Sequence, residues 1–156
     1  MPKRTIQTPL GPMLATSENE ALIGLSFDAE GEHDEACPIL DLVEEQLESY
    51  FEGDPVNFDI PLAPKGTPFQ HRVWDALRTV PKGETRSYTA IARQIGSHEA
   101  VRAVGAANGA NPIAIIIPCH RVIASDGRLH GYAGGLERKR ELLDLETKSL
   151  FTNNSD

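Results

Sequence analysis

The chain is poor in cysteine. Cys37 and Cys119 are its two cysteines in 156 residues, and neither belongs to a CxxC pair or a His/Cys cluster. A disulfide framework needs more cysteines, and a zinc site needs ligands closer together. The sequence therefore excludes a disulfide-stabilised fold, favours two free thiols and predicts no metal site.

Long apolar runs are absent as well. None approaches the roughly 20 residues of a membrane-spanning helix, and MPKRT at residues 1–5 lacks the apolar core of a signal peptide. A hydrophobic content of 40% is ordinary for a globular protein. We therefore expect a cytoplasmic protein without a membrane partner, built as one domain or two small ones.

Basic residues are scarce in the first part of the chain. Residues 1–64 hold 2 Lys and Arg against 14 Asp and Glu, a balance of −12, whereas residues 65–156 hold 13 against 9, or +4. The proline-punctuated segment 55–64 separates these parts and predicts a domain boundary. Phosphate contacts supply most of the affinity for nucleic acid, so such a partner would bind the second domain, which holds Cys119. The acidic N-terminal domain, residues 1–64, is predicted to be a scaffold.

Short strands and one helix are predicted in the N-terminal domain. Residues 5–8, 13–16 and 21–27 are strand-like and separated by turns, which predicts a small antiparallel sheet. Apolar residues then recur at helical spacing over residues 39–51, and Gly53 follows them.

The C-terminal domain, residues 65–156, opens with a strong helix start. Thr67 is a suitable N-cap, Pro68 suits the first helical position, and Gln70 completes a capping box. This helix is predicted to run to about Val80.

A helix-turn-helix is predicted next. Residues 88–95 and 99–109 have helical patterns, and the GSH segment at residues 96–98 separates them. The second helix is almost all small residues, with Arg102 as its long side chain. Two interpretations stay open: tight packing inside the domain, or close approach to the DNA minor groove, which is about 6 Å wide.

An apolar run precedes the second cysteine. Residues 113–117 predict a buried extended segment that ends at Pro118 and brings Cys119 to the edge of the core. A turn at residues 126–127 predicts a small hairpin between residues 122–124 and 128–130. The glycine-rich loop after it would let backbone N–H groups approach a flat ligand, and a last helix is predicted over about residues 136–146.

Cys119, His120 and Glu146 form a candidate set of nucleophile, base and carboxylate. A free thiol has a pKa of about 8.5, so it needs a base at neutral pH. Neighbours on an extended chain point to opposite sides, so His120 is expected to act through a water molecule or a local bend. Each residue also has a plain structural interpretation: a buried thiol, a surface imidazole and a carboxylate at a helix end.

PCHRV at residues 118–122, preceded by GANP at 109–112 and followed by GYAGG at 131–135, resembles the methylated-DNA–protein-cysteine methyltransferases, the O6-alkylguanine-DNA alkyltransferase family. The resemblance covers roughly residues 67–146, and its separated motifs agree in order and spacing. It implies an α+β fold. A small N-terminal antiparallel sheet with a helix, ribonuclease-H-like, would precede a mainly helical C-terminal domain with a winged-helix-like helix-turn-helix.

The resemblance also implies a function. The protein would repair DNA by direct, irreversible, single-turnover transfer of an alkyl group from O6-alkylguanine to Cys119, with O4-alkylthymine left open as a substrate. His120 would be the base, through a water molecule, and Glu146 would be its partner. Tyr88 would donate a hydrogen bond to the damaged guanine, and Asn111 would brace the turn before the acceptor segment.

DNA contacts and partners follow from the same resemblance. Arg102 would enter the duplex and fill the gap left by the extruded nucleotide, and Tyr132 would wall the base pocket. Position 133 is alanine where some members have serine, so a hydroxyl contact to the base is absent. No cofactor and no metal are implied, and the partner is double-stranded DNA, approached on its minor-groove side by a monomer. The further implied DNA contacts are Ala103, Arg121, Ala133 and Gly134.

Two other functions compete with this one. A damage sensor would bind the lesion without removing it, but relatives of that kind lack the acceptor cysteine that Cys119 provides. A cysteine hydrolase would turn over an acyl substrate, and it would leave the helix-turn-helix and Arg102 without a purpose.

Overall fold

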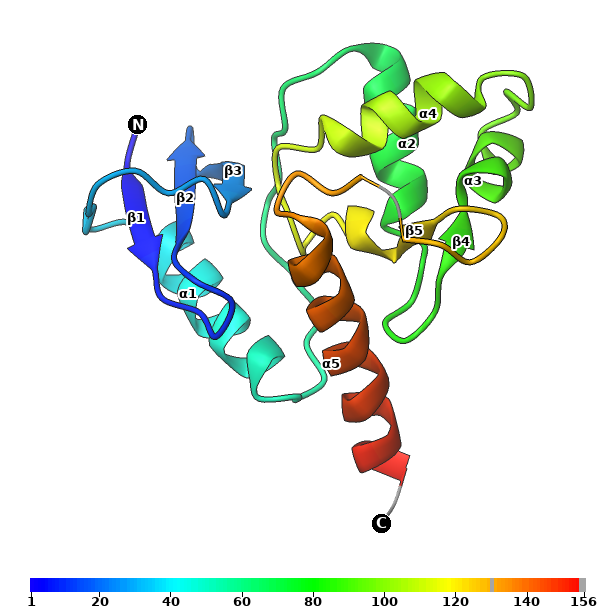
Figure 1. The fold of residues 1–156 in the computed structure, drawn as a ribbon. Coiled ribbons are helices and arrows are strands. Elements are labelled where there is room, and N and C mark those ends of the chain that lie inside the picture. The colour runs from blue at the N-terminus through cyan, green and yellow to red at the C-terminus, as the bar shows by residue number, and fades with distance from the viewer. Residues whose placement is uncertain (130, 155–156) are drawn as a thin grey trace. The chain divides into compact units, whose positions relative to one another are not determined.

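The computed structural model describes residues 1–129 and 131–154, with side chains up to Lys148. It divides into two compact units, residues 1–65 and a second unit that begins at Gly66. The first combines an antiparallel sheet with a helix, and the second is mainly helical, so the predicted α+β fold is confirmed (Figure 1).

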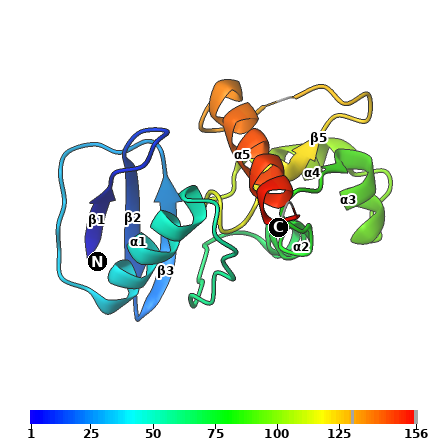
Figure 2. The same ribbon diagram turned by 90° about the horizontal axis from the view of Figure 1, so that it is seen from below.

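Antiparallel strands and a helix form the first unit. Strand order in the sheet is β1-β2-β3, and α1 packs its apolar side against one face of it (Figure 2). Asn19 and Glu20, both with positive φ, make the two-residue turn from β2 to β3 that strand twist favours. The elements are β1 (Lys3–Ile6), β2 (Met13–Glu18), β3 (Ala21–Ser26) and α1 (Pro38–Phe51).

Helices dominate the second unit. The predicted capping box at the start of α2 is confirmed, because Gln70 N donates to Thr67 Oγ1 at 3.1 Å and Thr67 N donates to Gln70 Oε1 at 2.9 Å. This helix ends at Leu77, before the predicted Val80, and the last helix runs past the predicted end at residue 146. The elements are α2 (Pro68–Leu77), β4 (Arg86–Ser87), α3 (Tyr88–Gln94), α4 (Val101–Gly109), η1 (Cys119–Arg121), β5 (Val122–Ile123) and α5 (Leu136–Asn154).

The predicted helix-turn-helix is present as α3 and α4. Ser87 Oγ caps α3 by accepting from Ala90 N at 3.0 Å, and Gly96, with φ of +76°, follows its end. α2 packs on both helices, and the indole N–H of Trp74 donates to Ala107 O at 2.9 Å. This bond ties α4 to the core of the unit.

The isoleucine-rich run is buried as predicted, but the prediction that it is extended is wrong. Residues 113–117 fold into a turn in which Ile117 N donates to Ile113 O at 3.2 Å and Ile115 has φ of +71°. Asn111 takes the place of a neighbouring strand: its Nδ2 donates to Ile117 O at 2.8 Å, and its Oδ1 accepts from Ile113 N at 3.0 Å. A side chain thus satisfies the backbone groups that extended pairing would have satisfied.

The predicted hairpin after the acceptor segment is confirmed at its turn, where Gly127 N donates to Ala124 O at 2.9 Å and Ala124 N donates to Arg128 O at 3.0 Å. The strand before the turn, β5, pairs in parallel with β4, which was not predicted, and His130 lies outside the described residues. The parallel pair connects the segment after the thiol to the start of α3.

Candidate active site

Cys119 begins the short helical turn η1 and is 5% exposed. Its N–H donates to Ile117 O at 2.8 Å, so the turn at residues 113–117 fixes the backbone position of Cys119. Burial raises the pKa of the Cys119 thiol, while a hydrogen bond with Asn111 and the positive charge of Lys139 oppose this effect. Such a thiol needs a base before it can act as a nucleophile.

His120 is fully buried and paired with Glu146 of α5, so its interpretation as a surface group is excluded. The imidazole Nε2 lies 2.7 Å from Glu146 Oε2. Because a carboxylate only accepts, Nε2 carries the proton and Nδ1 is the basic nitrogen. Nδ1 has no hydrogen-bond partner among the described residues. Burial lowers the pKa of His120, which keeps the ring neutral and able to accept a proton.

Arg121 is bound inside the unit. Its Nε and Nη2 donate to the two carboxylate oxygens of Glu146 at 2.9 and 2.8 Å, and its Nη1 donates to Val80 O at 2.7 Å. Although burial opposes it, hydrogen bonds from His120 and Arg121 lower the pKa of Glu146 well below its ordinary value. We therefore correct the prediction that Arg121 contacts DNA, because its guanidinium holds the carboxylate.

Sequence reasoning missed Lys139. This residue of α5 is fully buried, and its Nζ donates to Val122 O at 2.6 Å. Burial lowers the pKa of Lys139 to about 8. Its burial was not predicted because it lies in the basic run at residues 138–140, and such runs are usually exposed. The signal was its spacing with Leu142 and Glu146, which places all three on one helical face.

Sequence reasoning also missed Asn108. It lies on the buried side of α4, and its Nδ2 donates to Cys119 O at 3.3 Å. Asn111, one helical turn later, was predicted and does brace the turn before the acceptor. The shared face of the two asparagines was the available signal.

Two phenols interact electrostatically with the thiol. Burial and, second, the negative charge of a Cys119 thiolate raise the pKa of both Tyr88 and Tyr132. Tyr88 begins α3, and its ring lies 3.9 Å from the point where a side chain on Gly105 of α4 would start, an ordinary van der Waals distance, so the ring lies beside α4. Tyr132 Oη is buried without a hydrogen-bond partner among the described residues, which leaves a polar group for a ligand.

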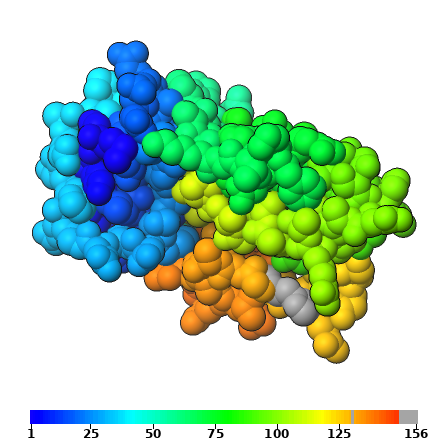
Figure 3. Space-filling view, turned by 90° about the horizontal axis from the view of Figure 1, so that it is seen from above, coloured from blue at the N-terminus to red at the C-terminus, as the bar shows by residue number. Residues whose placement is uncertain are grey.

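The remaining predicted residues lie at the surface. Arg102 and Ala103 are exposed on the outer side of α4, opposite the side that packs inside the unit, and Figure 3 shows this yellow-green segment on the molecular surface. The interpretation of tight packing inside the domain is confirmed for the inner side of the helix, and close approach to the DNA minor groove stays a prediction for its exposed side. In the glycine-rich loop, Ala133 is exposed and Gly134 is half-buried, with its carbonyl accepting from Arg138 Nη1 at 3.1 Å.

Comparison with known proteins gives the family of this chain. The model of the 6-O-methylguanine DNA methyltransferase DNA binding domain matches residues 68–148, and that of the ribonuclease-like domain matches residues 1–64. The chain belongs to the 6-O-methylguanine DNA methyltransferase family. The resemblance seen in the sequence is thereby confirmed, with a ribonuclease-like domain before a helical DNA binding domain.

Individual relatives agree with this membership. A methylated-DNA–protein-cysteine methyltransferase of Mycobacterium tuberculosis H37Rv is 49% identical over 149 residues, covering 92% of this chain and 90% of the relative. One from Methanosarcina barkeri is 49% identical over 154 residues, covering 93% and 96%. The crystal structure of Mycobacterium tuberculosis OGT in complex with DNA has a TM-score of 0.88 and 48% identity, covering 96% of this chain and 94% of that chain.

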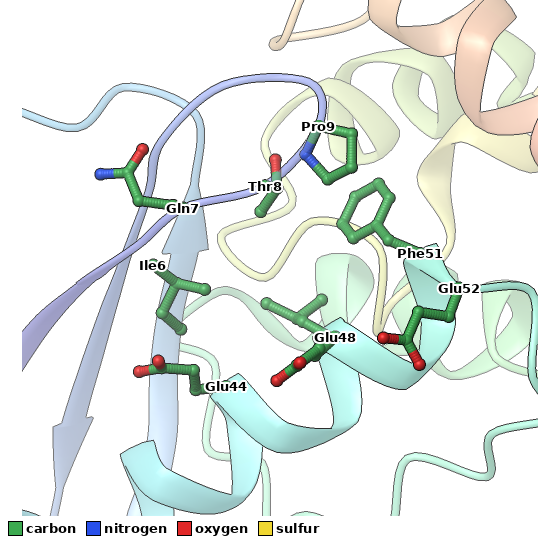
Figure 4. Close-up of a pocket in the computed structure, with 9 residues that line it drawn as sticks. Ile6, Gln7, Thr8, Pro9, Glu44, Glu48, Phe51 and Glu52 are labelled. Atoms are coloured by element: carbon green, nitrogen blue, oxygen red, sulfur yellow. The ribbon is translucent and has the colours of Figure 1, made fainter.

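The ribonuclease-like domain of this family member carries a groove of its own (Figure 4). It has a volume of about 330 Å³, an apolar floor that includes Leu47 and Phe51, and an edge formed by Glu44, Glu48 and Glu52. None of the residues that line it belongs to the predicted site.

Cys37 is the second thiol, and it lies in the ribonuclease-like domain just before α1. Its Sγ lies 3.3 Å from Ser17 Oγ. Although burial opposes it, hydrogen bonds from Ser17 and from the first amides of α1 lower the pKa of Cys37. It is therefore the natural control thiol in any alkylation experiment.

Within residues 1–129 and 131–154, no helix has the length and apolarity to cross a bilayer. In the same part of the chain, no group of three or more His, Cys, Asp or Glu residues could hold a metal ion.

Proposed function

We propose that Cys119 is the residue that accepts the alkyl group. As a member of its family, the protein repairs DNA by direct and irreversible transfer of a methyl group from O6-methylguanine to one of its own cysteines. The observation that carries the choice of Cys119 is the buried pair of His120, in the same turn as the thiol, and Glu146 of α5, with Nδ1 of the imidazole still able to accept a proton. Cys37 has no such base.

The thiol proton passes to His120 through a water molecule, because Nδ1 makes no hydrogen bond to a described residue, Cys119 included. Glu146 keeps the proton on Nε2 and stabilises the imidazolium that forms. The thiolate then attacks the alkyl carbon. A sulfur–carbon bond forms as the carbon–O6 bond breaks, and the electron pair leaves with guanine.

The departing guanine carries negative charge and needs a hydrogen-bond donor. The raised pKa of Tyr88 keeps its phenol protonated, so it can donate to the base. Tyr132 forms a wall of the base pocket, where its buried hydroxyl meets a polar edge of the ligand. The product is a thioether, which is chemically stable, so each molecule reacts once.

Double-stranded DNA binds along the outer side of α4, from the minor groove. Small side chains at Ala103 and Ala106 let the helix approach a groove about 6 Å wide. Extruding a nucleotide costs a few kcal/mol, and Arg102 takes its place in the stack. Backbone N–H groups of Ala133 and Gly134 face the extruded base. The protein acts as a monomer, in the cytoplasm.

A duplex oligonucleotide with a single O6-methylguanine tests the proposal. Intact mass and peptide mapping are expected to find one added methylene per molecule, on the Cys119 peptide. Cys119→Ala should retain affinity for DNA but accept no methyl group, and the matched control Cys37→Ala should react like the wild type. Methyl transfer to Cys37, or transfer by Cys119→Ala, would contradict the assignment.

A further inference from the structure

We propose that Asn108 is a positioning residue, whose hydrogen bond to the Cys119 carbonyl sets the place of the acceptor relative to the outer side of α4. This inference rests on the proposed function of Cys119 and adds a residue to that site.

The geometry around the Cys119 carbonyl carries the inference. Asn108 is 2% exposed, and its Nδ2 donates to Cys119 O at 3.3 Å. The same carbonyl accepts the N–H of Val122, which closes η1. The Cys119 peptide is therefore held from two directions, by its own turn and by α4. Both bonds therefore fix the position of the Cys119 backbone from which its side chain starts.

The other side of the same helix is the proposed DNA surface. Arg102 and Ala103 are exposed there, about one and a half helical turns before Asn108. A helix is rigid over this distance, so one hydrogen bond connects the surface that meets the groove to the peptide that carries the thiol. Asn111 does not duplicate this bond, because its amide is bound to Ile117 O and Ile113 N, and its hydrogen bond with Cys119 is to the thiol and not to the carbonyl.

Packing alone does not account for an asparagine at this position. Its Oδ1 is buried and has no hydrogen-bond partner among the described residues, which is unfavourable in a protein interior. A leucine has the same branched shape, although it is larger, and would leave no such group unsatisfied. The hydrogen bond that Nδ2 of Asn108 donates to the Cys119 carbonyl therefore explains why this residue is an asparagine.

Asn108→Leu tests the inference in the full chain with two reactions. The first is transfer from an O6-methylguanine duplex at saturating protein, which needs the acceptor in register with α4. The second is alkylation of Cys119 by iodoacetamide, followed by peptide mapping, which needs neither DNA nor a nucleobase. We expect the first rate to fall about tenfold, as for a small misplacement of a reacting group, and the second to change less than about twofold. Affinity for unmodified duplex and the melting temperature should not fall.

The controls separate this inference from the proposed function. Asn57→Leu, an exposed asparagine of the first unit, should match the wild type in every measurement. If wild-type protein methylates Cys119 and Asn108→Leu does so at the same rate, the inference fails while the proposed function stands. An equal fall of both rates, with or without a lower melting temperature, also overturns it, because the bond would then serve the thiol or the fold in general. If Asn108→Leu does not fold, Asn108→Ala is judged by the same two rates.

Discussion

At the residue scale, the carboxylate of Glu146 determines the charge state of the site. It is fully buried, and it accepts hydrogen bonds from His120 and from two nitrogens of Arg121. A buried carboxylate that is paired in this way stays ionised, and it fixes both the tautomer of the imidazole and the orientation of the guanidinium. Lys139 adds a buried positive charge that favours the thiolate of Cys119.

Glu146→Gln should therefore affect both stability and chemistry. The variant leaves Arg121 largely buried without its counterion, so the free energy of unfolding in urea at neutral pH should fall by about 3 kcal/mol. Methyl transfer should slow by about 100-fold, because the imidazolium loses its stabilising charge. Glu141→Gln, at an exposed position of the same helix, is the matched control. A variant as stable and as fast as the wild type would contradict the role of the carboxylate.

The same groups predict how stability depends on pH. Glu146 has a lowered pKa in the folded state, so its contribution is present above the unfolded value of about 4.3 and is lost as the pH falls below it. His120 also has a lowered pKa, so the unfolded state takes up a proton first, below about 6.5, and stability falls there too. Urea midpoints of the wild type should decline below about pH 6.5 because of His120, and further below about pH 4.3 because of Glu146. A smaller decline of Glu146→Gln below about pH 4.3 would assign that share to the carboxylate, and an equal decline would not.

At the element scale, α4 combines two surfaces that small residues make possible. Val104, Ala107 and Asn108 pack inside the second unit, while Arg102, Ala103, Ala106 and Gly109 remain exposed. Small side chains on both sides let the elements packed inside the unit, and any ligand on the exposed side, approach the helix backbone closely. In the proposed function, Arg102 is the long side chain of this exposed surface that enters the duplex.

Arg102→Ala should slow repair of O6-methylguanine in a duplex by about tenfold, because nothing would replace the extruded nucleotide in the stack. Repair in a single strand, where no stack has to be filled, should change much less. Transfer rates with matched duplex and single-stranded oligonucleotides measure the difference, and Arg140→Ala, on an exposed part of α5, is the control. Equal losses on both substrates would argue against insertion of Arg102.

At the scale of the whole molecule, charge is divided between the two domains. Residues 1–64 carry a formal charge of −12 and residues 65–156 one of +4. Phosphate contacts come from basic side chains, and Arg121 is bound to Glu146 and does not supply one. We therefore predict that the protein makes a small number of cationic contacts with DNA.

Affinity for duplex DNA should accordingly decrease only modestly with salt. With about three phosphate contacts, the dissociation constant should rise about 10- to 100-fold between about 50 and about 200 mM salt. Fluorescence anisotropy with a labelled unmodified duplex gives this slope. A much steeper slope would mean that the contact surface extends well beyond α4 and the glycine-rich loop.

Local patterns determined much of this protein. The capping box at Thr67, the strand and helix periods of the first 51 residues and the helix-turn-helix follow from neighbouring residues, because caps, turns and periodicity are short-range effects. The order and spacing of the motifs around Cys119 likewise indicated the family without any structure. Burial of the isoleucine run also followed from its composition.

Tertiary structure decided what depends on contacts between distant segments. It turned the isoleucine run into a turn braced by Asn111, assigned Arg121 to Glu146, and brought Lys139 and Asn108 to the acceptor segment. The composition of an apolar run predicts its burial, but its backbone hydrogen-bond partners come from elsewhere in the chain. The charge of a basic residue is known from the sequence, but its counterion is not. The sequence alone determined which chemical groups are present and in what order; the fold decided which of them meet, because hydrogen bonds and ion pairs act over a few ångströms in space, whatever the separation along the chain.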